Sequence, residues 1–320
     1  MIERTKEEKK YIVMIGEKDC CGLMYRWKTL LKNRDWDMDY FVTNNKTSYG
    51  FPNSSTDMTL LKDSLDKSDV IFWHRALKKG EDSTNFQDDS DEFDIDWSKY
   101  KDKTFIFLNG SVNLRVFARK HKELYKEFKG IVATTPDLCW LFDAKYVPQP
   151  IVMAPGELDK TKFVKPWFAT QHPTNRAIKD TNIFISACEK IKAEYPGDFD
   201  YKVESGLQNA ECLEEKEFNS HIEFEHLGGY FSVNALESAW LGQVVICHID
   251  DKYEQIISEF TGTHSLPFWS IDNPDGVYNS LKMIMKNPDF IYSQSKFAQD
   301  WMKTYWNGDK HFENLVKIIS

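Results

Sequence analysis

The sequence predicts an α/β fold of two domains, each built on a mostly parallel sheet. The chain has 320 residues, which is enough for about two domains of ordinary size. Short apolar runs rich in Val, Ile, Phe and Tyr alternate with longer helical patterns, and such runs are typical of strands buried on both faces. Midway, the cluster Pro148, Pro150 and Pro155 interrupts this alternation and indicates a linker between the domains.

The apolar runs and the patterns between them give an order of elements for each half. The expected strands cover residues 11–15, 39–43, 70–73, 105–108 and 131–133, then 167–169, 201–203, 222–224 and 244–247. The expected helices cover 23–31, 60–65 and 114–128, then 183–191, 210–218, 235–241 and the stretch from residue 288 onward. Strand–helix–strand alternation favours parallel sheets with right-handed crossovers. We expect Rossmann-like domains over 1–152 and 153–295, and helices over 296–320 that pack back on the first domain.

The bulk properties exclude several classes of protein. A net charge of −9 argues against a general nucleic-acid coat protein, which needs a basic surface. No apolar run approaches the roughly 20 residues that span a bilayer, and the charged N-terminus lacks the apolar core of a signal peptide. We therefore expect a cytoplasmic protein, in the host cytoplasm if the chain is viral. The six cysteines form no CxxC pair, which argues against a zinc site or a disulfide framework.

The most specific stretch is HPTNRAIKDT, residues 172–181, between a predicted strand and a predicted helix. Arg176 and Lys179 are therefore expected in a loop at the carboxyl edge of the second sheet, where open α/β sheets bind their ligands. Two cations beside a helix N-terminus suit a diphosphate. The alternative is a solvated loop with incidental charges.

A second stretch, LGGYFSVNALESAWLGQVVI, covers residues 227–246. Its paired glycines let the backbone approach a ligand closely. Ser232 is a candidate cap for the helix that follows. Glu237 comes about one turn later, where its carboxylate could accept the two hydroxyls of a ribose. Gly242 ends the helix, and the next strand follows.

Together the two stretches resemble motifs of retaining glycosyltransferases with two Rossmann-like domains, the GT-B type of the glycogen-synthase-like superfamily. Its bacterial and viral members carry an H-x-P-x-N-R-x-x-K-G-T loop and a G-W-Y-G-x-x-A-x-E-A-x-A-x-G segment. Both motifs occur here in the same order, each at its expected strand–helix junction. The resemblance covers residues 171–250, and the remainder of the chain fits by pattern only.

The resemblance implies two domains that face each other across a cleft and transfer a hexose or pentose from a nucleoside diphosphate sugar. It implies that Arg176 and Lys179 hold the donor diphosphate during catalysis and that Glu237 binds the donor ribose. Asn175 and Gly229 belong to the same donor-binding set. The turn that would supply backbone contacts to phosphate comprises Tyr230, Phe231, Ser232 and Val233.

Three positions depart from the superfamily pattern. Gly229 stands where a glutamate is common, eight positions before Glu237. A carboxylate for the donor sugar is then absent, or supplied by Glu223 or Glu225. Asp180 replaces the usual glycine after the lysine, and Arg176 and Lys179 are closer together than in the commoner arginine-x4-lysine form.

The N-terminal half is expected to carry the acceptor side. The loop after its first strand, with Gly16, Cys21 and Gly22, is not a G-x-G-x-x-G motif, and this argues against a dehydrogenase. The resemblance places this loop at the cleft. It also implies a histidine near the donor sugar, here His74; the alternative is a histidine that only packs in the core. Asn109 ends another strand and is expected to line the same cleft.

A basic stripe is expected on the helix over residues 114–128. Arg115, Arg119, Lys122 and Lys126, with Lys129 beyond, fall on one side at a period of 3.6 residues. They form either an ordinary solvated face or a docking surface for an anionic membrane or polyanion.

The sequence thus predicts a metal-independent glycosyltransferase with no cofactor besides its nucleotide-sugar substrate. Arg176 and Lys179 would neutralise the leaving diphosphate, so no metal is required. Two D-x-D patterns, Asp89–Asp91 and Asp94–Asp96, are interpreted as part of an acidic loop. One alternative is a degenerate member that binds nucleotide sugars or glycans without turnover. The acceptor is not identified; a modified base in viral DNA is the alternative to a small acceptor.

Overall fold

The computed structural model describes residues 9–17, 19–43, 51, 57–74, 78–79, 86–87, 95–110, 114–115, 118–154 and 156–320. The chain divides into two compact units. Unit 1 comprises Met1–Val152 and His311–Ser320, and unit 2 comprises Met153–Lys310. Pro148 and Pro150 lie just before the first boundary, whereas Pro155 falls outside the described residues.

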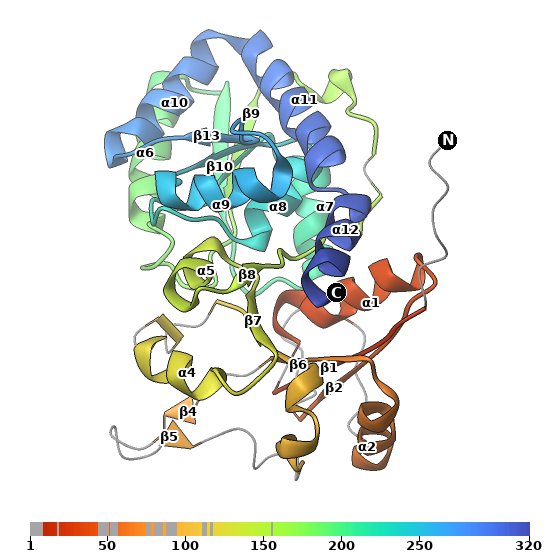
Figure 1. Cartoon of the computed structure of the whole chain (residues 1–320). Coiled ribbons are helices and arrows are strands. Elements are labelled where there is room, and N and C mark those ends of the chain that lie inside the picture. Colours follow the sequence, from red (N-terminus) through yellow and green to blue (C-terminus); the bar gives the residue numbers. More distant parts are fainter. Residues whose placement is uncertain are drawn as a thin grey trace. The chain divides into compact units, whose positions relative to one another are not determined.

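Unit 1 is built on a parallel sheet whose described strands run in the order β2-β1-β3-β6-β7-β8 (Figure 1). The strands are β1 (Tyr11–Gly16), β2 (Asp37–Val42), β3 (Val70–His74), β6 (Thr104–Leu108), β7 (Gly130–Ala133) and β8 (Lys145–Tyr146). The helices are α1 (Leu23–Lys32), α2 (Met58–Lys67), α4 (Ala118–Tyr125), α5 (Pro136–Phe142) and, at the chain end, α12 (Gly308–Ile319). A short antiparallel ladder of β4 (Lys78–Lys79) and β5 (Phe86–Gln87) precedes the two D-x-D patterns in the chain.

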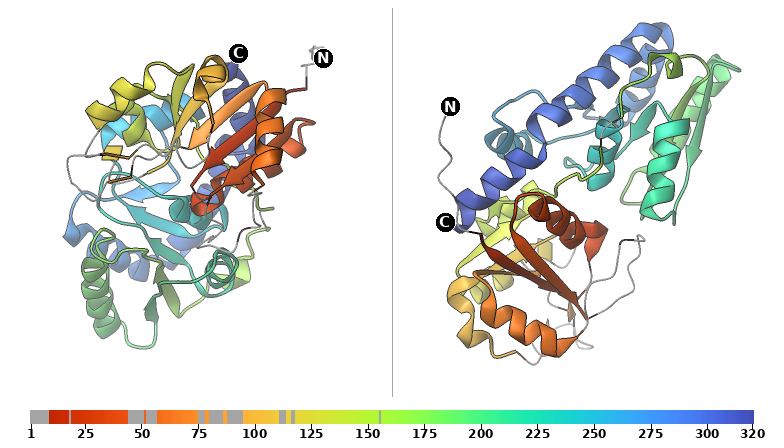
Figure 2. Two further views of the ribbon diagram at one scale, coloured as in Figure 1. Left: turned by 90° about the horizontal axis from the view of Figure 1, so that it is seen from below. Right: turned by 90° about the vertical axis from the view of Figure 1, so that its right-hand side faces the viewer.

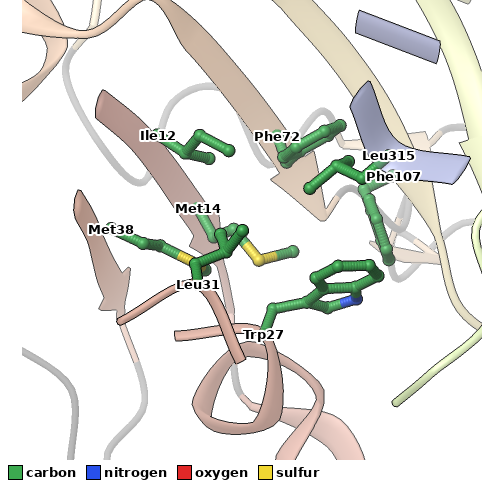
Figure 3. Close-up of a pocket in the computed structure, with 8 residues that line it drawn as sticks. All are labelled: Ile12, Met14, Trp27, Leu31, Met38, Phe72, Phe107 and Leu315. Carbon is green, nitrogen blue, oxygen red and sulfur yellow. The ribbon is translucent and has the colours of Figure 1, made fainter. Parts of the chain in front are cut away.

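The core of unit 1 joins segments from both ends of the chain. Ile12 and Met14 of β1 are buried in one cluster with α1 and with Leu315 of α12. Figure 2 shows the dark blue C-terminal helix beside the red strands of unit 1. A small cavity in this core is lined by Ile12, Met14, Trp27, Leu31, Met38, Phe72, Phe107 and Leu315 (Figure 3). Apart from the indole N–H of Trp27, these side chains are apolar, so the cavity is a packing gap in the core.

Unit 2 repeats the architecture with a parallel sheet in the order β10-β9-β11-β12-β13. The strands are β9 (Trp167–Gln171), β10 (Phe199–Val203), β11 (Ile222–Phe224), β12 (Val244–Cys247) and β13 (Phe268–Ser270). The helices are α6 (Thr181–Glu194), α7 (Asn209–Asn219), α8 (Val233–Trp240), α9 (Asp251–Thr261), α10 (Pro274–Lys286) and α11 (Pro288–Tyr305). Because β9, β11 and β12 are parallel and adjacent, the loops after them share one edge of the sheet.

The predicted strands all occur, with shifts of one or two residues at their ends. The sequence patterns missed β4, β5, β8, β13, α5, α9 and α10. The basic helix is shorter than predicted: α4 ends at Tyr125, so Lys126 and Lys129 follow it. Of the C-terminal helices, α11 and the first three residues of α12 belong to unit 2, and the chain from His311 onward belongs to unit 1. The side-chain amide of Gln299 in α11 donates to the carbonyl of Trp240 at 3.2 Å, which attaches α11 to α8.

Candidate functional site

The loop after β9 is held in a defined conformation by its own polar groups. The Asn175 side chain accepts hydrogen bonds from the backbone N–H of Ala177 at 3.0 Å and of Ile178 at 3.3 Å. The amide of Gln171 donates to the carbonyl of Lys179 at 2.6 Å. Asp180 ends the loop at φ 52°, a left-handed conformation that favours glycine. This explains in physical terms why the resembled motif has a glycine there.

Lys179 of this loop lies at the N-terminus of α8. Its ammonium forms an ion pair with Glu225 and donates to Ser232 Oγ at 3.3 Å. The side chain of Lys179 is 14% exposed and that of Glu225 only 1%. Ser232 is the N-cap residue of α8, but its side chain makes no capping hydrogen bond, contrary to our expectation. Its hydroxyl accepts from Lys179 instead.

Arg176, on the same loop, is exposed. No described residue pairs with its guanidinium. The structure therefore brings Lys179 to the N-terminus of α8 and leaves the Arg176 guanidinium available to a ligand.

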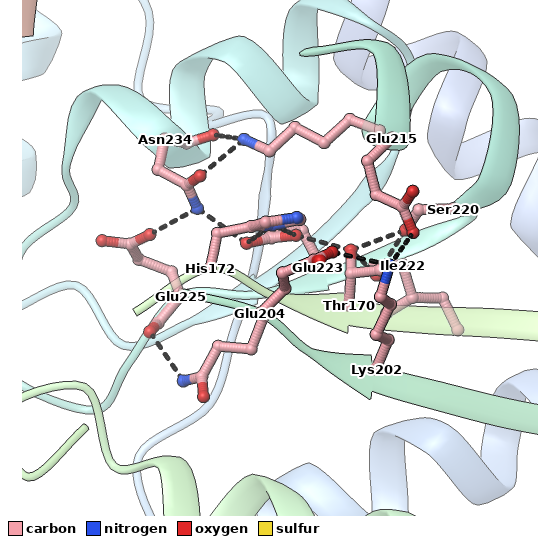
Figure 4. A network of polar contacts seen from close by, with 12 residues as sticks. Thr170, His172, Lys202, Glu204, Glu215, Ser220, Ile222, Glu223, Glu225 and Asn234 are labelled. Atoms are coloured by element: carbon pink, nitrogen blue, oxygen red, sulfur yellow. Dashed lines mark hydrogen bonds and ion pairs between the residues drawn. The ribbon is translucent and has the colours of Figure 1, made fainter. Parts of the chain in front are cut away.

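A buried polar network continues from this point beneath α8 (Figure 4). Glu223, fully buried in β11, accepts from Thr170 Oγ1 at 2.7 Å and lies 3.3 Å from His172 Nδ1. The side-chain amide of Asn234 donates to Glu223 at 2.7 Å and to Glu225 at 3.3 Å. The Lys216 ammonium donates to the Asn234 side chain at 2.6 Å. The network thus fixes the first turn of α8 over β11.

The two buried carboxylates of this network are ionised. Burial raises the pKa of Glu225, but the charges of Lys179 and His226, with hydrogen bonds from Lys179 and Ser232, outweigh it and lower the pKa to about 2. Burial likewise raises the pKa of Glu223, while the charges of His172 and Lys216 and hydrogen bonds to the carboxylate bring it below its ordinary value.

The glycine turn after β11 is tied to its surroundings at several points. His226 Nδ1 accepts from the backbone N–H of Gly228 at 2.9 Å. The carboxylate of Asp180 accepts from the backbone N–H of Leu227 at 2.8 Å. The ring of Tyr230 lies 4.4 Å from that of His226, edge to face. These contacts hold the turn against the loop after β9.

A side chain at Gly229 would be strained and would have to displace the Asp250 side chain. Its φ is +80°, and a Cβ there would come within 2.6 Å of the Asp250 carboxylate. The Asp250 side chain is 40% exposed, and it pairs with His248 Nε2 at 3.1 Å. Glu223 and Glu225, which we considered as replacements for the missing glutamate, are buried in the network beneath α8. Sequence reasoning missed Asp250, although its place just after β12, at the carboxyl edge, was a usable signal.

The remaining predicted donor-site residues lie in α8 and the turn before it. Glu237 is 4% exposed, and its carboxylate accepts from the Asn209 side chain at 3.0 Å. Phe231 is buried, with its ring 5.0 Å from that of Phe268, so its side chain is a core group. Val233 is the first residue of α8.

In unit 1, the strand ends β1 and β3 bring Gly16 beside His74. A Cβ on Gly16 would lie 3.1 Å from His74 Nδ1, so the glycine permits the close approach. Asn109, after β6, accepts from Thr134 Oγ1 at 2.9 Å through its side-chain oxygen.

The loop between β1 and α1 takes two consecutive left-handed residues, Cys21 at φ 56° and Gly22 at φ 67°. The carbonyl of Cys21 accepts from the Gln149 side chain at 2.7 Å. Asp19, missed by the sequence analysis, accepts from the backbone N–H of Met24 at 2.8 Å in the first turn of α1. Burial raises the pKa of Asp19 to about 6.

The predicted basic stripe is largely neutralised within unit 1. Arg115 pairs with Asp137 at 2.5 Å, Lys122 with Asp143, and Lys126 with Glu123 at 2.7 Å. Arg119 is exposed.

Of the two D-x-D patterns, Asp89–Asp91 and Asp94 lie outside the described residues. Asp96 is described, and its carboxylate accepts a hydrogen bond from the backbone N–H of Ser98. Within the described part of the chain, no group of three or more His, Cys, Asp or Glu side chains is arranged to hold a metal. Among the helices described above, none is long and apolar enough to cross a membrane.

Comparison with solved structures identifies the fold. No family model matches the sequence, and no curated protein matches it. An α-glucosyltransferase in complex with UDP-glucose and DNA containing an abasic site superposes with a TM-score of 0.68 at 10% identity, covering 98% of this chain and 100% of that chain. The chain has the GT-B fold. The predicted fold class is therefore confirmed.

Two further solved structures support the same fold. A glycosyltransferase from Rickettsia africae superposes with a TM-score of 0.62 at 9% identity, covering 98% of each chain. A sucrose-phosphate synthase from Thermosynechococcus elongatus gives a TM-score of 0.59 at 11% identity, covering 97% of this chain and 98% of that one. Identities this low extend the similarity to the fold and no further.

Proposed function

We propose that this protein is a glycosyltransferase that moves a sugar from a nucleoside diphosphate sugar to an acceptor, with retention of anomeric configuration. The observation that carries the proposal is the position of Lys179, nearly buried at the N-terminus of α8, with the exposed Arg176 three residues before it. A helix N-terminus with two cations suits a diphosphate. Nucleotide sugars carry that group, and UDP or UDP-glucose is bound in several solved structures with the same fold.

In the proposed reaction, Arg176 and Lys179 stabilise charge on the departing diphosphate. Asn175 shapes their loop, and the turn from Gly229 to Val233 supplies backbone groups to the phosphates. The Glu237 carboxylate accepts hydrogen bonds from the ribose hydroxyls, while the Asn209 side chain holds that carboxylate in place. His74 of unit 1 acts at the donor sugar, beside the loop that contains Gly16, Cys21 and Gly22, with Asn109 on the acceptor side.

A binding protein without turnover is the second candidate, and it rests on Gly229. The structure weakens that argument, because the Asp250 carboxylate occupies the space beside Gly229. We expect slow hydrolysis of the sugar donor in the absence of acceptor. Release of free sugar from UDP-glucose, or from another nucleotide sugar found by thermal shift, would identify an enzyme. A protein that binds these donors and never hydrolyses or transfers the sugar would be a binding protein.

DNA with a modified base is the proposed alternative acceptor. It is supported by solved structures of the same fold that hold DNA, although three of the four stripe cations have internal partners here. Arg119→Glu should then weaken a DNA gel shift at low salt. Lys126→Glu, which changes a lysine that Glu123 already neutralises, should have less effect. Sedimentation with anionic vesicles tests a membrane surface in the same way; binding to neither points to a small acceptor.

A further inference from the structure

Glu225 has the surroundings that a bound phosphate would have. Its carboxylate accepts from the Lys179 ammonium, from the backbone N–H of Ser232 at 3.2 Å and from the Asn234 side chain at 3.3 Å. An ammonium, a backbone amide at a helix start and a side-chain amide form a typical anion site. Here the anion is part of the protein, and it is 1% exposed.

The charges around this carboxylate leave little attraction for a second anion. The charges of Lys179 and Glu225 cancel each other, and Asp180 adds a negative charge on the loop after β9. His226 Nε2 lies 3.4 Å from Glu225, but burial lowers the pKa of His226 to about 4, so its ring is neutral at pH 7. Lys216 approaches Asn234 from α7, and its charge faces Glu223. At neutral pH, Arg176 is then the cation of this site that has no internal counter-charge among the described residues.

We propose that Glu225 is an internal competitor for the donor diphosphate, and that it limits the affinity of the site for anions. This inference rests on the proposed function, because it assumes that the diphosphate binds Lys179 and the first turn of α8. In the donor-free protein, Glu225 occupies the Lys179 ammonium and the Ser232 amide. The arriving diphosphate takes the ammonium from Glu225, while Arg176 provides the additional attraction that a nucleoside or an uncharged sugar cannot use.

The test compares two buried glutamates two residues apart, Glu223 in β11 and Glu225 directly after that strand. Glu225→Gln removes the competing charge and keeps the side-chain shape. Glu223→Gln is the matched control, since Glu223 does not contact Lys179. Calorimetric titration with inorganic diphosphate and with UDP should show binding at least about tenfold tighter in Glu225→Gln, and nearly unchanged in Glu223→Gln. In a Lys179→Met background, Glu225→Gln should no longer tighten binding.

The outcomes separate the inference from the proposed function. If the wild type binds UDP and Glu225→Gln binds it equally or more weakly, Glu225 does not compete with the diphosphate. Glu225 would then be a positioning residue for Lys179. Absence of binding of both inorganic diphosphate and UDP, in wild type and variant alike, would remove the proposed function as well. Because a buried variant can fail to fold, a structure of the wild type with inorganic diphosphate gives a second test. We expect the Lys179–Glu225 pair to separate beyond 4 Å, and an intact pair beside bound diphosphate would contradict the proposal.

Discussion

The carboxylate of Asp180 accepts a hydrogen bond from the backbone N–H of Leu227 at 2.8 Å, and so joins the loop after β9 to the turn after β11. These two segments carry the two sequence motifs. A glycine at position 180 would relieve the left-handed backbone but could not make this bond. The departure from the resembled motif at this position therefore has a structural role, because it fixes one proposed donor-binding segment against the other.

Arg176 is expected to recognise the diphosphate and not the nucleoside. Arg176→Ala should weaken UDP binding by the loss of one charge-assisted contact, typically roughly 1.5–3 kcal/mol. Uridine binding should change little, and the fold should persist because the side chain is exposed. Calorimetric titration of both ligands checks this. Equal weakening of uridine and UDP would remove Arg176 from the phosphate site.

Glu237 is expected to bind the ribose. Glu237→Gln should lower donor affinity, because the amide is a weaker acceptor for two hydroxyls than the carboxylate. Asn209→Ala should have a smaller effect, since it frees the Glu237 carboxylate to move without removing it. If wild-type protein bound a 2′,3′-dideoxy nucleotide as tightly as the normal one, this role would be wrong.

His74 is expected to serve turnover more than donor affinity. His74→Ala should lower kcat and leave the Kd for UDP nearly unchanged. The imidazole packs against Gly16, so the melting temperature must be measured as a control for a simple loss of packing. A stable variant with normal turnover would make His74 a packing residue.

Gly229 and Asp250 are expected to be coupled. Gly229→Ala should destabilise the protein by about 1–3 kcal/mol, because alanine is strained at φ +80° and its Cβ collides with the Asp250 carboxylate. Adding Asp250→Gly should recover the part of the loss that comes from the collision. Urea unfolding of the single and double variants measures this coupling. Additive effects would show that the collision contributes nothing.

His226 is expected to make stability depend on pH. Burial lowers its pKa to about 4 from 6.5, so between these values the unfolded chain binds more protons and the free energy of unfolding falls as the pH falls. Between pH 6.5 and pH 4, this shift lowers the free energy of unfolding by about 3 kcal/mol in total. His226→Asn keeps an acceptor for the Gly228 N–H and removes the titration. Urea unfolding from pH 7 to 4 should show a flatter profile for the variant, and parallel profiles would contradict the shift.

The sequence predicted the strands of both sheets except the edge strands β8 and β13, and it predicted the two motif-bearing loops, because buried parallel strands have continuous apolar runs and their loops follow directly. It could not predict the ion pair of Lys179 with Glu225. These residues are 46 positions apart, and their contact depends on the packing of β11 against the loop after β9. The relation of Asp250 to Gly229 was missed for the same reason, because it exists only across two neighbouring loops. Helices α9 and α10 were missed although their buried residues recur at helical spacing, as Val277, Leu281 and Ile284 do in α10.

The core of unit 1 contains Leu315, Ile318 and Ile319 from the last ten residues of the chain. During synthesis, every residue of unit 2 has therefore been made before unit 1 has all of its core. The core of unit 1 therefore cannot be completed while unit 2 is being made, which departs from the usual order in which the first domain folds before the next is made. On the ribosome, the apolar face of unit 1 that these residues cover is therefore exposed until synthesis reaches them.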